Sequence, residues 1–118
     1  MPNPDIKSAS DALAAAIRQS EEYLTYKQLK DSVLADQTNK ALVTEYQRLQ
    51  TKLQMEAVMG TDASETDVQN FKQLSGLLMM NASIAQYMLA QMRVQQMMSE
   101  IFQTVTLAAE MEINLPGI

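Results

Sequence analysis

The side chains that could do chemistry in this chain of 118 residues are carboxylates, amines and thioethers, because the sequence has no His and no Cys. Their absence removes disulfides, thiolate nucleophiles, soft metal sites and the usual general base. The adjacent Glu21 and Glu22 could suggest acid chemistry or a metal site. Neighbouring side chains on a helix point about 100° apart, so a solvated first turn is the favoured interpretation. We expect no enzyme activity, no catalytic or metal-binding residue and no cofactor.

Basic residues beside aromatic rings suggest a different chemistry, the binding of RNA. Lys27 and Lys30 lie three residues apart next to Tyr23 and Tyr26, a combination of charge and rings that suits single strands. The formal net charge of −5 nevertheless repels phosphate on average, so no nucleic-acid partner is expected first. The alternative function is therefore an RNA-binding module that uses Lys27, Lys30, Lys40, Arg48 and Lys52.

Thioethers are the third group, since the chain contains ten Met. Six of them could form an adaptable surface for several partners: Met79, Met80, Met88, Met92, Met97 and Met98. Core filling is the favoured interpretation, because helical stripes of this kind are usually interior and Met fills gaps well.

The elements that must position these groups are predicted to be helices in a single domain over residues 1–118. With only 5% aromatic residues, three Gly and three Pro, the composition favours helices over strands. Apolar spacing and capping residues predict helices over 4–19, 21–35, about 37–59, 65–79 and from 82 for about 30 residues toward Pro116. The fold class is all-α, with four to five helices, a long antiparallel helical hairpin and short N-terminal helices.

Local signals mark most of the predicted helix ends. Ser20 is a plausible N-cap, although the first two segments could also be one bent helix. Asp36 or Thr38 can cap the third helix, and Gly60 stands where a left-handed C-terminal cap is expected. Asn81 can cap the fifth helix, or it can be a mere kink between two nearly collinear helices.

The fifth helix continues an apolar repeat that begins before it, with steps of three and four from Leu77 to Ala108. Between Lys72 and Glu110 only Arg93 and Glu100 are charged, too few to solvate an ordinary surface helix. A helix of about 30 residues would be about 45 Å long and would overhang its own domain. A second copy covers the overhang most economically, so we expect a homodimer that forms a helical bundle.

The predicted interface is centred on this repeat, with part of the third helix beside it. Its residues are Tyr46, Leu49, Leu53, Ile84, Tyr87, Gln91, Val94, Met98, Ile101 and Val105. Gln91 is the one polar member of the repeat between residues 77 and 108. It could penalise wrong registers as a buried amide, or it could lie partly solvated at the rim.

Three segments in this order resemble the YlbF/YmcA family of small bacterial helical proteins, which includes YheA-like members. They are LAAAIRQSEEY at 13–23 with Tyr26 following, YQRLQ at 46–50 and NASIAQYM at 81–88. In the family, the last segment usually reads Asn-Pro before the helix, and here Ala82 replaces that proline. The resemblance covers most of the chain and is closest to the YheA-like branch.

The resemblance implies an all-α dimer or hetero-oligomer that acts as an adaptor without enzymatic activity. Some family members join a complex linked to RNase Y-dependent mRNA processing, competence, sporulation and biofilm formation. Those members hold iron–sulfur clusters through cysteines, which this chain lacks. Our leading hypothesis is a cytoplasmic regulatory adaptor with a possible protein partner. The opening residues show no secretory signal and the apolar runs are too short to cross a membrane, so no membrane association is expected.

Overall fold

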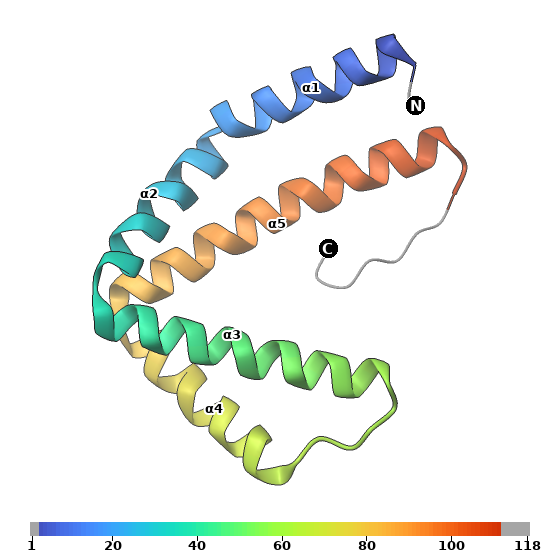
Figure 1. Ribbon diagram of the computed structural model, residues 1–118. Coiled ribbons are helices and arrows are strands. Elements are labelled where there is room, and N and C mark those ends of the chain that lie inside the picture. The colour runs from blue at the N-terminus through green and yellow to red at the C-terminus, as the bar shows by residue number, and fades with distance from the viewer. Residues whose placement is uncertain (1–2, 112–118) are drawn as a thin grey trace. The chain divides into compact units, whose positions relative to one another are not determined.

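The computed structural model describes residues 3–111, which form five α-helices (Figure 1). They are α1 (Pro4–Gln19), α2 (Glu21–Ala35), α3 (Gln37–Val58), α4 (Glu65–Met80) and α5 (Ala82–Ala108). No strand occurs within residues 3–111. The predicted all-α fold class, with four to five helices, is confirmed.

Side-chain caps fix the first three helix starts. Asn3 accepts a hydrogen bond from the Asp5 N–H at 2.7 Å, and Pro4 opens α1 where a missing N–H costs nothing. The Ser20 hydroxyl accepts from the Tyr23 N–H at 3.1 Å, and the extended backbone of Ser20 separates α1 from α2. Of the two candidate caps for α3, Asp36 is used, since its carboxylate accepts from the Asn39 N–H at 2.9 Å.

The end of α3 and the start of α4 also follow their sequence signals. Gly60 has a φ of +71°, and the N–H groups of Gly60 and Thr61 bond to Ala57 and Glu56 carbonyls at 3.3 and 2.9 Å. This pattern is a Schellman cap, in which glycine adopts the left-handed conformation without a steric penalty. Ser64 caps α4 by accepting from the Asp67 N–H at 3.4 Å.

Asn81 breaks the helix completely, so the expectation of nearly collinear helices is wrong. Its backbone is extended, with φ −93° and ψ 109°, and its N–H bonds back to the Leu78 carbonyl at 3.1 Å. The Asn81 side chain accepts from the Ile84 N–H at 3.2 Å and donates to Asn39 Oδ1 at 3.0 Å. The backbone of Asn81 thus ends α4, and its side-chain amide caps α5 and bonds to the first turn of α3.

The fifth helix is shorter than predicted, with 27 residues that end at Ala108. The reason is a left-handed residue, Glu110, with φ 55°. The N–H groups of Glu110 and Met111 bond to Leu107 and Thr106 carbonyls at 3.1 and 3.0 Å, which is a second Schellman cap. Pro116, the predicted stop, lies outside the described residues.

The chain forms two compact units: the hairpin unit, Lys30–Met88, and the terminal unit, which combines Met1–Leu29 with Leu89–Ile118. The prediction of a single domain over 1–118 is not tested by this division and stays a prediction. In the hairpin unit, α3 and α4 run antiparallel, since Tyr46 stacks on Phe71 and Lys52 pairs with Asp67. Seven apolar residues form its core: Val33, Val43, Leu49, Leu74, Leu78, Ile84 and Tyr87.

The terminal unit has almost no core of its own. Among its described residues, Ala90 is the one in the buried class, at 3% exposure. Helix α1 buries none of its residues, although its apolar positions recur at helical spacing. The apolar faces of this unit are therefore largely accessible to a partner.

The two Schellman caps predict opposite effects of glycine at their left-handed positions. Gly60→Ala should lower the free energy of unfolding by about 1 kcal/mol through backbone strain alone, because a Cβ at Gly60 meets nothing within 4 Å. Glu110→Gly should raise the free energy of unfolding, because glycine adopts a positive φ without a steric penalty. The increase should stay below about 1 kcal/mol, because glycine also makes the unfolded chain more flexible. Urea denaturation measures both changes, and equal signs would contradict the assignment of left-handed conformations.

Candidate functional site

The predicted interface residues of α5 differ strongly in burial. Ile84 and Tyr87 are buried within the single chain, at 0% and 2% exposure, which leaves little of their surface for a partner. Gln91, Val94 and Ile101 are half-buried. Met98 and Val105 are exposed. The half-buried position of Gln91 fits both the register and the rim interpretations, and the interface assignment stays a prediction.

The three predicted residues of α3 lie in the hairpin unit and pack within it. Leu49 is 2% exposed, while Tyr46 and Leu53 are half-buried. The ring of Tyr46 stacks on Phe71 with centroids 5.0 Å apart and planes inclined by 21°. Sequence reasoning missed Phe71, although it is one of only two Phe in the chain. A cross-hairpin aromatic contact cannot be read from spacing within one helix.

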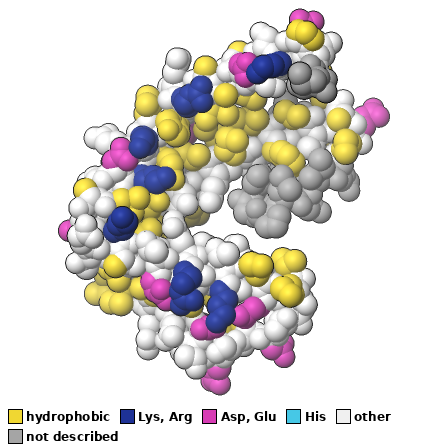
Figure 2. Space-filling view, in the orientation of Figure 1, with side chains coloured by type: hydrophobic (Ala, Val, Ile, Leu, Met, Phe, Trp, Pro, Cys, Tyr) yellow, Lys and Arg dark blue, Asp and Glu magenta, His cyan; other side chains and the backbone are white. Residues whose placement is uncertain are grey.

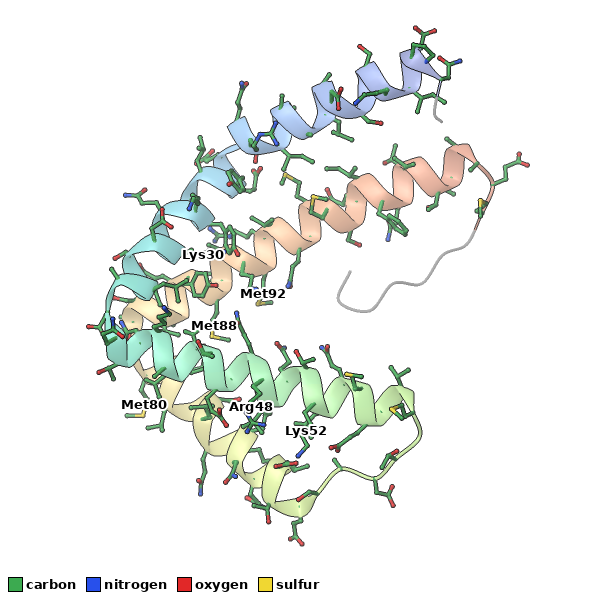
Figure 3. The ribbon with its side chains drawn as sticks, in the orientation of Figure 1. Lys30, Arg48, Lys52, Met80, Met88 and Met92 are labelled. Carbon is green, nitrogen blue, oxygen red and sulfur yellow. The ribbon has the colours of Figure 1, made fainter. Side chains whose placement is uncertain are left out.

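Two of the five basic residues proposed for RNA binding are held by carboxylates of the hairpin unit. Arg48 donates to both carboxylate oxygens of Glu45 at 2.6 and 3.0 Å, and Lys52 lies 2.6 Å from Asp67 Oδ2 (Figure 3). The hydrogen bonds from Arg48 lower the pKa of Glu45, and the contact with Asp67 raises the pKa of Lys52. Both cations are therefore neutralised locally, which weakens their attraction for phosphate.

The other three basic residues lie on α2 and α3. Lys27 and Lys30 lie three residues apart on α2, and both are engaged in interactions within the chain. Lys40 is exposed on α3. The RNA-binding alternative thus gains no support from the arrangement, and it stays a prediction.

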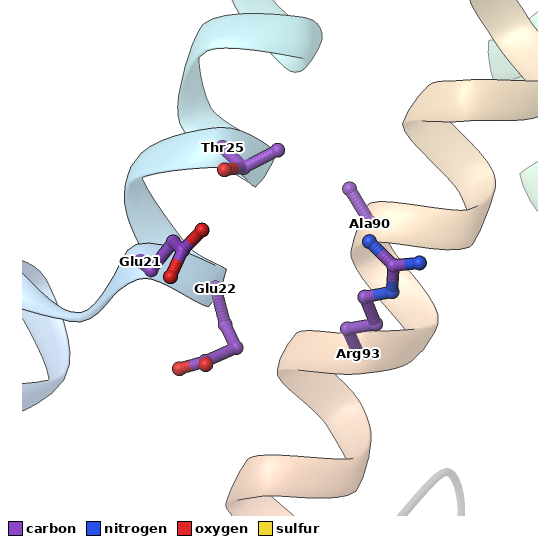
Figure 4. Close-up of a pocket in the computed structure, with 5 residues that line it drawn as sticks. All are labelled: Glu21, Glu22, Thr25, Ala90 and Arg93. Carbon is purple, nitrogen blue, oxygen red and sulfur yellow. The ribbon is translucent and has the colours of Figure 1, made fainter.

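A small cleft in the terminal unit brings Glu21 and Glu22 opposite Arg93. Its volume is about 220 Å³, with Thr25 and Ala90 completing the lining. Figure 4 shows the carboxylates on α2 and the guanidinium on α5 on opposite sides of the cleft. Both glutamates are exposed in the first turn of α2, where they complement the helix dipole. This matches the favoured interpretation of a solvated first turn.

A site for a metal ion requires a cluster of side chains that can act as its ligands. Residues 3–111 contain no group of three or more His, Cys, Asp or Glu side chains arranged to hold a metal ion. Within the same range, no helix is both long and apolar enough to cross a bilayer.

The methionine surface is more exposed than expected. Met80, Met92 and Met79 are 86%, 63% and 62% exposed, so the preference for core filling is wrong for these three within the chain. Met88 and Met97 are half-buried. At the end of α3, Met55 and Met59 are also exposed, at 58% and 73%. The sequence did not point to these two, because the predicted interface residues Tyr46, Leu49 and Leu53 lie on another face of α3.

Comparison with known proteins assigns this helical chain to a family. Residues 6–108 match the family described as "Control of competence regulator ComK, YlbF/YmcA". The chain belongs to the YlbF/YmcA family, and the resemblance found in its sequence is confirmed.

Relatives share much of the chain. A "UPF0342 protein" of Bacillus pumilus is 32% identical over 75% of each chain, and one of Halothermothrix orenii is 27% identical over 75% of each. A solved structure described as a "Protein of Unknown Function (DUF964) from Bacillus stearothermophilus" has a TM-score of 0.77, with 19% identity over 90% of this chain and 93% of the other. The structural likeness supports the fold.

Burial predicts which apolar residues stabilise the hairpin unit. Leu49→Ala should lower the free energy of unfolding by about 2–5 kcal/mol, because it removes a buried side chain and leaves a cavity. Met80→Ala, at a site 86% exposed, should change it by less than about 0.5 kcal/mol. Chemical denaturation of both variants measures the difference, and equal losses would refute the burial pattern.

The Glu45–Arg48 pair predicts a small dependence of stability on acid. The pKa of Glu45 is lower in the folded chain than its ordinary value of 4.5, so the pair stabilises above that pH and loses its effect as pH falls through the lowered pKa. Glu45→Gln should lack this loss. The melting temperatures of the two proteins should therefore converge as the solution is acidified below 4.5, and added salt should reduce their difference.

Proposed function

We propose that this chain is a non-catalytic helical adaptor of the cytoplasm, which regulates gene expression by assembling with a second copy and with partner proteins. The observation that carries the proposal is the uncovered apolar surface of the terminal unit. Ile6 on α1 is 60% exposed, and Met98 and Val105 on α5 are 36% and 57% exposed. Burial of such side chains against a partner lowers the free energy of the assembly, because it removes apolar surface from water.

The shape and charge of α5 favour a second copy as the first partner. Its 27 residues correspond to about 40 Å, and Arg93 and Glu100 are its two charged residues. A two-fold arrangement places the same apolar stripe of both copies face to face, which is the commonest symmetry of soluble oligomers. Half-buried Gln91, Val94 and Ile101 would then lie beside the exposed ends of the stripe.

The regulatory part of the proposal is supported by the family, whose description names the control of a competence regulator. The chain has no His and no Cys, which is a poor inventory for catalysis. It also has no thiolates to hold an iron–sulfur cluster, so regulation would operate through protein contacts alone.

Sedimentation velocity tests the assembly. The wild-type chain should sediment as a dimer at micromolar concentration, whereas Met98→Glu combined with Val105→Glu should be monomeric, because charge would be buried in the contact. Met59→Glu, a matched change at an exposed methionine of the hairpin unit, should remain dimeric. A wild-type monomer at every concentration would overturn the proposal.

Partner binding is tested separately by affinity purification from the native cell. Recovery of one defined protein with wild-type chain, in amounts that approach the bait, is the expected result. Recovery of the chain alone would count against an adaptor.

A further inference from the structure

The free end of the α3–α4 hairpin carries an apolar patch that the fold does not use. Met55, Val58 and Met59 are 58%, 77% and 73% exposed, and they lie within a little more than one helical turn on one face of α3. Figure 2 shows hydrophobic side chains gathered at this end of the hairpin. We call these three residues the tip patch.

The sequence on both sides of the tip patch is rich in acidic residues. Between residues 52 and 67, four acidic residues stand against one basic residue: Glu56, Asp62, Glu65 and Asp67 against Lys52. Lys52 lies 2.6 Å from Asp67 and is also attracted by Glu56, so the exposed Asp62 and Glu65 are the carboxylates that it leaves unbalanced. Asp62 lies in the loop between the helices, where it caps no helix and forms no ion pair within the described residues.

An apolar patch next to carboxylates is a poor binding surface for several kinds of partner. Two copies meeting tip to tip would bring like charges together, and nucleic acid and anionic lipid would be repelled by the same carboxylates. Three side chains also cannot supply the roughly 800 Å² per partner of a stable protein interface. What remains is a short segment that inserts a few apolar side chains and surrounds them with positive charge.

We propose that the tip patch docks a cationic amphipathic segment of a partner protein, with apolar side chains on Met55, Val58 and Met59 and Lys or Arg side chains toward Asp62 and Glu65. Methionine suits this task, because its flexible and polarisable side chain adapts to apolar partners of different shape. The inference deepens the proposed adaptor function and rests on it, since it names the chemistry of the partner.

The test uses the full chain and a fluorescent amphipathic peptide of Leu and Lys, with binding followed by anisotropy. Met55→Ser, Val58→Ser and Met59→Ser combined should weaken binding about tenfold. Asp62→Asn with Glu65→Gln should weaken it several-fold and flatten its dependence on salt. All three tip positions are exposed, so melting temperatures should stay near that of the wild type.

The matched control replaces two exposed apolar residues elsewhere in the hairpin unit, Leu77→Ser with Met80→Ser, at 57% and 86% exposure. It should bind the peptide like the wild type. If the control variant lost as much affinity for the peptide as the tip variant, the binding would be nonspecific hydrophobic association and the inference would be overturned. The same conclusion would follow if the wild-type chain bound a peptide of Leu and Glu as tightly as the peptide of Leu and Lys. A photo-crosslinker at position 58 should join the chain to the peptide, and crosslinks between copies instead would also overturn it.

Failure of this inference is distinguishable from failure of the adaptor proposal. A dimer that ignores the peptide would overturn the tip assignment and leave the assembly through α5 intact. A monomer that binds the peptide through the tip would support this assignment and overturn the dimer.

Discussion

The arrangement of the hairpin unit depends on the helix break at Asn81. Leu78 and Ile84, on its two sides, are the most deeply buried side chains of the chain's described part, each at 0% exposure. On a continuous helix, residues six apart point roughly 120° away from each other, so one face could not bury both. The extended backbone at Asn81 and its amide bond to Asn39 allow both to enter one core.

Helix starts could be predicted from sequence because their determinants are local. Ser20, Asp36 and Ser64 each accept a backbone N–H within three residues, and Gly60 is left-handed as expected. The break at Asn81 was harder to predict, because the apolar repeat runs through it without a change of step. The end of α5 was missed because Glu110 adopts a conformation that glycine usually takes.

The candidate site could be predicted only in part, for a different physical reason. An apolar repeat has the same pattern whether its residues pack inside one chain or against another. Ile84 and Tyr87 lie in the core, whereas Val105 of the same repeat is exposed. Charge pairing has the same limitation, since Lys52 finds its carboxylate across the hairpin, 15 positions away in sequence.

The two units differ in how their segments are ordered along the chain, and this order decides which unit can fold first during synthesis. The hairpin unit consists of one continuous segment, Lys30–Met88, whose helices are joined by short connections. It can therefore close as soon as it leaves the exit tunnel. The terminal unit joins the two ends of the chain, so α1 must wait until α5 has been synthesised. During that interval the apolar positions of α1 remain in water, and rapid translation of α5 would shorten it.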